Sequence, residues 1–272
     1  METEEGTQPE TTIEELKKEI AALKQARNEV WLKTTHSLDF YNLENVLHRD
    51  GDLPARILKN GTRMWYKNGK LHRNNDLPAI IWPFGNKEWY QNGQLHREND
   101  LPAIIWNNGS KKWYKEGKCH RDGDKPAAIY SDGTQEWYKN GKLHRDGDLP
   151  AKIQANGNQF WYKNGELHRD NDLPAVIWIW GTQEWYKNGK KHRDGDLPAE
   201  IWNGTQKWYK NGKLHRDNDQ PAVILADGTQ EWWKNGKLHR DNDQPAAILA
   251  DGTQEWWKNG TRYRNQKNCL VM

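Results

Sequence analysis

The chain has 272 residues, of which 41 are basic and 38 acidic, so its formal net charge is only +3. Nucleic acid requires a clustered basic face, and this near balance does not provide one, so no nucleic-acid partner is expected. Seventeen tryptophans and few aliphatic residues exclude an ordinary Leu, Val and Ile core, so aromatic rings must supply much of the buried area.

The first 46 residues differ from the rest of the chain. Residues 1–10 are acidic and lack the apolar run of a secretory signal. A hydroxyl at Thr11 or Thr12, followed by two glutamates, predicts the start of a short α-helix. Apolar residues at heptad spacing continue it and form the candidate oligomerisation face: Ile13, Leu16, Ile20, Leu23 and Val30. The helix either caps the first repeat or mediates self-association, and residues 31–46 are expected to form an irregular cap.

A unit of 24 residues then runs nine times from Leu47 to Thr261, and the copy Lys191–Lys213 is one residue short. A fixed period of this size is typical of repeat proteins, in which each copy buries its apolar side against its neighbours. The same groups recur in every copy, whereas an active site gathers a few unlike groups, so we expect no enzyme. The expected domains are a cap over 1–46, the repeats over 47–261 and a basic tail over 262–272.

Each copy is expected to contain two antiparallel β-strands joined by two turns. Asn-Gly, as at Asn140 and Gly141, is the strongest local signal for a two-residue hairpin, because both residues must adopt a positive φ. A second turn carries Asp-Gly or Asn-Gly, and a proline bends the chain before the next strand. The predicted fold is therefore all-β: an elongated antiparallel ribbon or solenoid of stacked hairpins with a short N-terminal helix.

Strand alternation assigns the aromatic residues to faces. In Pro-Ala-x-Ile-x the last residue faces away from Ala and Ile, and in Trp-Tyr the two rings take opposite faces. Both faces therefore carry rings, and a flat sheet with one polar face is not expected. The candidate binding-face residues are Trp82, Trp106, Trp178, Trp202, Tyr138, Tyr162 and Tyr186.

The unit resembles the variant form of the MORN repeat, whose pattern is W-Y-x-N-G-x-L-H-R-x-x-D-L-P-A. Residues Trp137–Arg145 and Asp148–Ala151 carry the resemblance, which extends over about four fifths of the chain. Such repeats are found in proteins of large DNA viruses of amoebae and of bacteria. The resemblance implies stacked β-hairpins and a role in protein or membrane attachment.

The recurrent His-Arg-Asp motif has a protein-kinase counterpart, but the phosphate-binding loop and Asp-Phe-Gly are absent. We expect each histidine to be a structural ring bonded to turn oxygens, with pH sensitivity as an alternative. The aspartates of Asp50-Gly51-Asp52 and its copies are expected to cap turns, although a row of weak cation sites is an alternative. No metal and no cofactor are expected. Four Asn-Gly-Thr or Asn-Gly-Ser sequons are interpreted as turns.

The last four residues, Cys269 to Met272, match a C-a-a-X prenylation box, and methionine in the last position favours a farnesyl group. The upstream basic residues would assist, because one lipid chain holds a protein to a membrane only marginally. These membrane-proximal candidates are Lys258, Arg262, Arg264 and Lys267. A frayed apolar tail or a docking tail for the last repeat is the alternative. Cys119 stands where most copies have Leu, so we expect a buried apolar residue there.

Together these features predict a non-catalytic repeat scaffold that binds an unidentified protein and is held at a cytosolic face of a host membrane. A homo-oligomer through the N-terminal helix is an additional expectation. The alternative is a structural or virion-associated protein assembled by lateral packing of ribbons. An enzyme that binds carbohydrate on its aromatic face is disfavoured, because no pair of carboxylates stands apart from the repeat.

Overall fold

The computed structural model describes residues 30–263, and every regular element in that range is a β-strand. No helix of residues 30–263 has the length and apolar character needed to cross a membrane. The predicted helix lies outside the described residues except at Val30, which begins strand β1. The prediction of a helix is therefore wrong at Val30. The chain divides into two compact units, one ending at Gly117 and the other beginning at Lys118.

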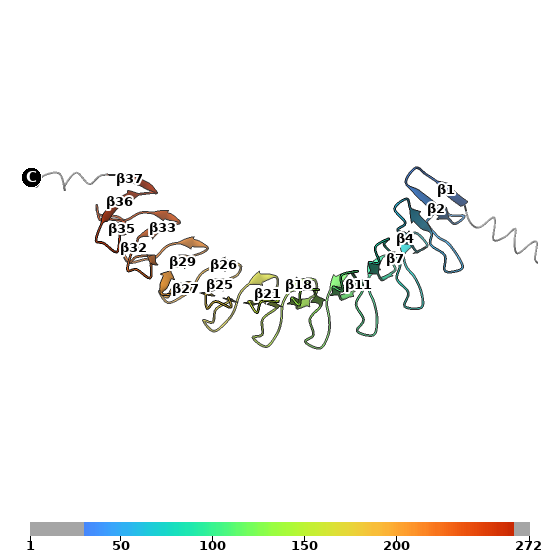
Figure 1. Ribbon diagram of the computed structural model, residues 1–272, viewed down its shortest axis with the longest axis horizontal. Helices are drawn as coiled ribbons and strands as arrows, with labels where there is room; N and C mark the ends of the chain where they lie inside the picture. The colour runs from blue at the N-terminus through green and yellow to red at the C-terminus, as the bar shows by residue number, and fades with distance from the viewer. Residues whose placement is uncertain (1–29, 264–272) are drawn as a thin grey trace, which may run out of the picture. The chain divides into compact units, whose positions relative to one another are not determined.

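In the first unit, strands pair antiparallel in chain order and form one ladder (Figure 1). Its strands are β1 (Val30–Lys33), β2 (Ser37–Tyr41), β3 (Arg56–Leu58), β4 (Arg63–Met64), β7 (Ile80–Ile81), β8 (Lys87–Glu88), β11 (Ile104–Ile105) and β12 (Lys111–Lys112). The hairpin β1–β2 occupies the predicted cap, and β2 pairs with β3 of the first copy. The cap therefore extends the sheet by a regular hairpin.

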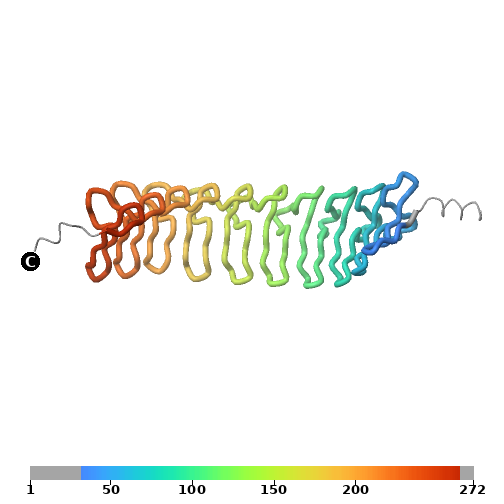
Figure 2. The backbone as a smooth tube through the Cα atoms, turned by 90° about the horizontal axis from the view of Figure 1, so that it is seen from above, coloured from blue at the N-terminus to red at the C-terminus, as the bar shows by residue number. Residues whose placement is uncertain are grey.

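The second unit repeats this arrangement, as the regular spacing of its turns shows (Figure 2). Its ladder contains β15 (Ala128–Ile129), β16 (Gln135–Glu136), β19 (Lys152–Ile153), β20 (Gln159–Phe160), β23 (Val176–Ile177), β24 (Gln183–Glu184), β27 (Glu200–Trp202), β28 (Thr205–Lys207), β31 (Val223–Ile224), β32 (Gln230–Glu231), β35 (Ala247–Ile248) and β36 (Gln254–Lys258).

The Asn-Gly hairpins form separate two-stranded sheets, so a copy contains four short strands and the expectation of two is wrong. In the first unit these strands are β5 (Tyr66–Lys67), β6 (Lys70–Leu71), β9 (Tyr90–Gln91), β10 (Gln94–Leu95) and β13 (Tyr114–Lys115). In the second they are β14 (Lys118–Cys119), β17 (Tyr138–Lys139), β18 (Lys142–Leu143), β21 (Tyr162–Lys163), β22 (Glu166–Leu167), β25 (Tyr186–Lys187), β26 (Lys190–Lys191), β29 (Tyr209–Lys210), β30 (Lys213–Leu214), β33 (Trp233–Lys234) and β34 (Lys237–Leu238). The last strand, β37 (Thr261–Tyr263), pairs instead with β36 of the ladder.

The backbone at these turns has the predicted geometry. Asn140 and Gly141 have φ values of 52° and 83°, as a type I′ turn requires. The hairpins also stack between copies, because the amide of Gly141 donates to the carbonyl of Cys119 at 2.8 Å. Cys119 is buried, as expected.

The short copy loses its residue in the other turn. In the preceding copy, the loop after Trp178 closes through hydrogen bonds from Trp178 to Thr182 and from Gly181 to Trp178. In the short copy only Asn203 and Gly204 lie between the strands, with φ values of 42° and 79°. A two-residue turn therefore replaces the longer loop, and β27 and β28 each extend to three residues. The ladder continues without a register shift.

Alternation places the rings on two distinct faces. Ile80 pairs with Glu88 and Ile81 with Lys87, so Ile80 and Glu88 share one face with Trp82 and Tyr90. We call this side, and its equivalents in each copy, the tyrosine face. On the opposite tryptophan face the tryptophan of most copies is 6–7% exposed and the alanine of Pro-Ala is 0% exposed, while Ile80 and its apolar equivalents are buried on the tyrosine face. This register agrees with the predicted alternation.

Candidate interaction site

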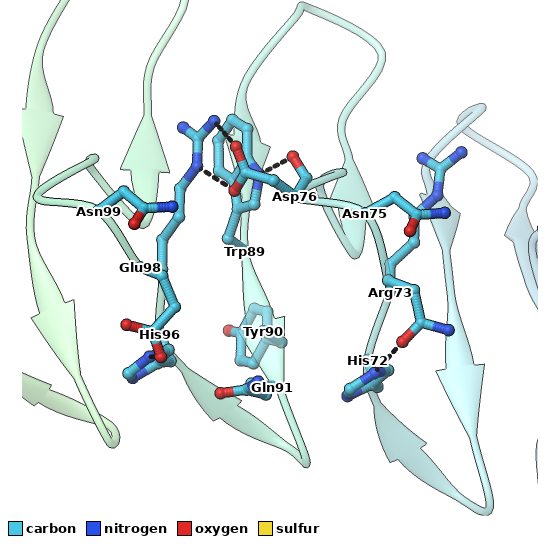
Figure 3. A pocket seen from close by; sticks show the side chains of 12 residues that line it. His72, Arg73, Asn75, Asp76, Trp89, Tyr90, Gln91, His96, Glu98 and Asn99 are labelled. Atoms are coloured by element: carbon cyan, nitrogen blue, oxygen red, sulfur yellow. Dashed lines mark hydrogen bonds and ion pairs between the residues drawn. The ribbon is translucent and has the colours of Figure 1, made fainter.

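The tryptophan face is covered by the chain's own His-Arg-x-x-Asp loops. The Arg97 guanidinium lies 3.8 Å above the Trp89 ring, and its Nε and Nη2 each donate at 2.7 Å to the Asp76 carboxylate of the preceding copy (Figure 3). Its Nη1 donates to the carbonyl of Pro102. The Trp89 indole donates to the Asp76 carbonyl at 3.0 Å. This Arg-Trp-Asp lattice leaves no room for a partner on the tryptophan rings.

The same three contacts link consecutive copies in both units. The hydrogen bonds from arginine are the main cause that lowers the pKa of each aspartate in the lattice. The further sets are Arg73 with Trp65 and Asp52, Arg145 with Trp137 and Asp124, Arg169 with Trp161 and Asp148, Arg193 with Trp185 and Asp172, Arg216 with Trp208 and Asp196, and Arg240 with Trp232 and Asp219.

Each repeat histidine has both ring nitrogens engaged. The Nδ1 of His168 accepts the amide N–H of Asn188, which lies 20 residues further along the chain, so the proton of a neutral ring lies on Nε2 and is donated to Asp170. The expected bond to a turn oxygen is confirmed. Because neither nitrogen is left over, the ring is poorly placed to act as a general base or a metal ligand.

The alternative of cation sites at the aspartate-rich loops finds little support. Both carboxylate oxygens of Asp148 are occupied by Arg169, and Asp170, the first aspartate of the next loop, binds His168. These carboxylates join copies, which differs from the expected turn capping. No cluster of three potential metal-binding side chains occurs within residues 30–263. Small cavities of about 200–320 Å³ lie between successive loops, lined by these same paired groups.

The tyrosine face has a different character, because its rings are half-buried and not covered by a loop lattice. Tyr138 donates its hydroxyl proton to Glu136 at 2.9 Å, and Lys152 neutralises that carboxylate. Burial and the bond to Glu136 raise the pKa of Tyr138, so its ring stays neutral and uncharged. Lys191 similarly lies between Glu184 and Glu200. Internal ion pairs thus neutralise the charges that interrupt the aromatic rows.

An exposed aromatic cluster rises from this face in the second unit. The Trp178 ring packs edge-on against Phe160, with 5.5 Å between ring centroids. It also stacks on Trp180, with 5.1 Å between centroids and an angle of 14° between the planes of the two indoles. Trp180 is 60% exposed and Trp202, the equivalent of Trp178 in the next copy, is 51% exposed. We call Trp178, Trp180 and Trp202 the tryptophan cluster. Such a concentration of exposed indole is typical of a binding surface.

Sequence reasoning missed Trp180 and also Phe84, which is 80% exposed in the first unit. Both occupy a turn position that holds Asn or Asp in every other copy with the longer loop. At Asp132, for example, that side chain accepts the amide of Thr134 at 2.8 Å, a bond that an aromatic residue cannot make. The signal in the sequence was this departure from the repeat pattern. In two copies an exposed aromatic ring replaces a side chain that would stabilise the turn with a hydrogen bond.

The remaining predicted residues are distributed as follows. Trp82, Trp106, Trp178, Tyr138, Tyr162 and Tyr186 are half-buried on the tyrosine face, and Trp202 is exposed. Lys258 is exposed at the end of β36, whereas Arg262 belongs to β37 and forms an ion pair with Glu255 at 3.0 Å. The repeats' last strand therefore reaches Tyr263, beyond the expected boundary at 261. Ile13, Leu16, Ile20, Leu23, Arg264, Lys267 and Cys269 lie outside the described residues.

The comparisons with known proteins add no relative. No family model matches the chain, and no curated protein matches it.

Proposed function

We propose that the chain is a non-catalytic repeat scaffold that binds a partner protein through its tyrosine face, with the tryptophan cluster as the anchor. The observation that carries this proposal is the exposure of Trp180 at a turn position where Asn or Asp would stabilise the fold. Tryptophan is the residue type most often responsible for binding energy at protein interfaces. The resemblance to the variant MORN repeat supports an attachment role.

The internal neutralisation of charge on the tyrosine face supports a protein partner over a nucleic acid. Lysines there are paired with glutamates, as Lys152 is with Glu136 and Lys207 with Glu200. A nucleic-acid platform combines stacked rings with unpaired basic groups that contact phosphates. A protein interface instead combines aromatic anchors with a polar rim, which these residues resemble.

We further propose that Cys269 carries a prenyl group that holds the scaffold at a cytosolic membrane face. In that reaction the cysteine sulfur displaces diphosphate from an isoprenyl diphosphate, forms a thioether and loses its proton. Lys258, Arg262, Arg264 and Lys267 would add attraction to anionic lipids. The intact mass of the protein made in a eukaryotic cell tests this directly: the mass of the added lipid is expected, and an unmodified mass would refute it.

Lateral packing into a virion or inclusion is the second candidate. The half-buried rows of tyrosine on one face favour it, because a second ribbon could cover them. Sedimentation velocity of the purified protein over a hundredfold range of concentration separates the two. A monomer at all concentrations supports a scaffold for another protein, whereas concentration-dependent growth supports packing.

A further inference from the structure

Within residues 30–263, the last ladder strand of the second unit, β36, has no pairing partner over part of its outer edge. Each equivalent strand in this unit pairs on both sides, as β32 pairs with β31 and with β35 of the next copy. β36 pairs with β35, and β37 covers only its residues from Trp256 to Lys258. Gln254 and Glu255 therefore have no strand on their outer side within residues 30–263. An open edge of this kind is a template for another strand.

The nine residues that follow Tyr263 are in register with the missing strand. A shift of 24 residues places Trp256-Trp257-Lys258-Asn259-Gly260 on Trp232-Trp233-Lys234-Asn235-Gly236. The same shift places Arg264 on Arg240, Cys269 on Pro245, and Val271-Met272 on Ala247-Ile248. Ala247 and Ile248 are β35, the strand that pairs with Glu231 and Gln230. Residues 264–272 thus have the length and order of the first part of a tenth copy.

The groups that would receive this segment are present at the end of the second unit. Arg240 binds Asp219 through both carboxylate oxygens and lies 3.9 Å above Trp232, which is only 6% exposed. The next set, Asp243 and Trp256, has no arginine among residues 30–263, and Trp256 is only half-buried. Asp243 accepts one bond, from the Tyr263 hydroxyl at 3.2 Å. Arg264 aligns with the arginine that would complete the set.

We infer that residues 264–272 belong to a tenth copy and dock reversibly on the outer edge of β36, which shields Cys269. In this register Met272 lies opposite Gln254, Val271 opposite Glu255, and Arg264 binds Asp243. Cys269 takes the place of a proline that is buried in the preceding copy, Pro245. The shielding of a prenylation site rests on the proposed function, whereas the docking does not.

The docking is reversible because two residues of the segment do not suit its loop. Asn242 and Asp243 have φ values of 57° and 54°, a conformation that asparagine and aspartate tolerate. Gln266 and Lys267 align with Asn242 and Asp243, and a positive φ costs them more free energy than it costs asparagine or aspartate. The segment 264–272 therefore binds its edge less firmly than the equivalent residues of a complete copy do.

Amide hydrogen exchange of unmodified protein made in bacteria tests the docking. Each equivalent tryptophan of the second unit donates its amide to an alanine carbonyl of the next copy, as Trp232 does to Ala246 at 2.8 Å. The Trp256 amide should therefore exchange more slowly in the full chain than in a chain ending at Tyr263, with Trp232 unchanged as the internal control. Equal exchange of Trp256 in the two chains would overturn the docking.

Thiol labelling tests the shielding in a Cys119→Leu background, in which only Cys269 reacts. The double variant Gln266→Asn with Lys267→Asp restores the loop residues of the preceding copy and should slow maleimide labelling by at least about tenfold. Arg264→Ala should speed it. Equal rates in all three proteins would overturn the shielding. Because neither assay needs a lipid, an unmodified mass in eukaryotic cells would refute prenylation and leave the docking intact.

Discussion

Arg169 lies 3.9 Å above the ring of Trp161 and, with the same guanidinium, binds both oxygens of Asp148 in the preceding copy. One side chain thus joins its own copy, through the Pro174 carbonyl, to both the core ring and the loop of the preceding copy. The lattice explains how a chain with few aliphatic residues forms a regular array. Each copy is held by indole, guanidinium and carboxylate groups that satisfy one another.

Replacement of Arg169 tests this arrangement. Arg169→Ala should lower the free energy of unfolding by about 1–2 kcal/mol, because the cation–π contact and two charged hydrogen bonds are lost while Asp148 remains partly hydrated. Arg169→Lys should recover little of that loss, since an ammonium group can neither form the fork nor stack. Urea unfolding followed by tryptophan fluorescence measures both variants. A lysine variant as stable as the parent would contradict the account.

The buried pair of Asp39 and Arg56 gives the first unit a defined acid sensitivity. The hydrogen bonds from Arg56, at 2.9 Å and 2.6 Å, hold the pKa of Asp39 below its ordinary value. A lowered carboxyl pKa stabilises the fold above the ordinary value, and the benefit is lost as the pH falls through the folded value. Stability should therefore be flat from pH 7 to about 5 and decline below about 4. Asp39→Asn should be less stable than the parent at pH 7 and should lose less stability as the pH falls. An equal loss of stability in the two proteins would show that other groups cause the acid sensitivity.

The half-buried tyrosines of the tyrosine face are expected to set the highest pH at which the fold is stable. Burial, with Glu200 nearby, raises the pKa of Tyr209 to about 12. A raised phenol pKa stabilises the fold below the ordinary value, and this benefit is lost as the pH rises through the folded value. Titration of phenolate absorbance at 295 nm should show Tyr209 ionising well above pH 10, and Tyr209→Phe identifies its contribution. If Tyr209→Phe instead lost an absorbance step near pH 10, the burial of Tyr209 beside Glu200 would be contradicted.

The short copy predicts a strict backbone requirement at Asn203. Because φ at this residue is 42°, Asn203→Ala should cost about 1 kcal/mol more stability than Asn203→Gly. Thermal unfolding of the two variants measures the difference, and the glycine variant serves as the matched control. Equal stabilities would mean that the turn is not of the two-residue type.

Much of the fold follows from local sequence rules. The 24-residue period, the Asn-Gly turns and the opposite facing of Trp161 and Tyr162 depend on nearest neighbours, so they can be predicted from the chain alone. The partners of Asp148 could not, because Arg169 is 21 residues away and the contact depends on how one copy stacks on the next. The bond from Asn188 to His168 also joins residues far apart along the chain, 20 positions, and depends on how successive hairpins stack.

The candidate site was predictable only in part. Trp178 and Trp202 follow from strand alternation, but Trp180 lies in a turn, where alternation gives no direction. Its signal was a departure from the repeat, an aromatic residue in place of the turn-stabilising Asn or Asp. Function is expected at positions where a residue breaks a local folding preference and gains no compensating structural contact.

Trp180→Asp separates folding from binding and tests the proposed function most directly. The new carboxylate can accept the Thr182 amide as Asp132 accepts that of Thr134, so the fold should be as stable as the parent or up to about 1 kcal/mol more stable. Leu43→Ala, which removes another exposed apolar side chain, is the matched control. Proteins captured from the natural host's lysate and quantified by isotope labelling should include a defined partner that the parent and Leu43→Ala retain and Trp180→Asp loses. Its purified form should bind the parent at least about tenfold more tightly than Trp180→Asp. Equal capture and equal affinity for the three proteins would contradict the proposal that the tryptophan cluster anchors a partner.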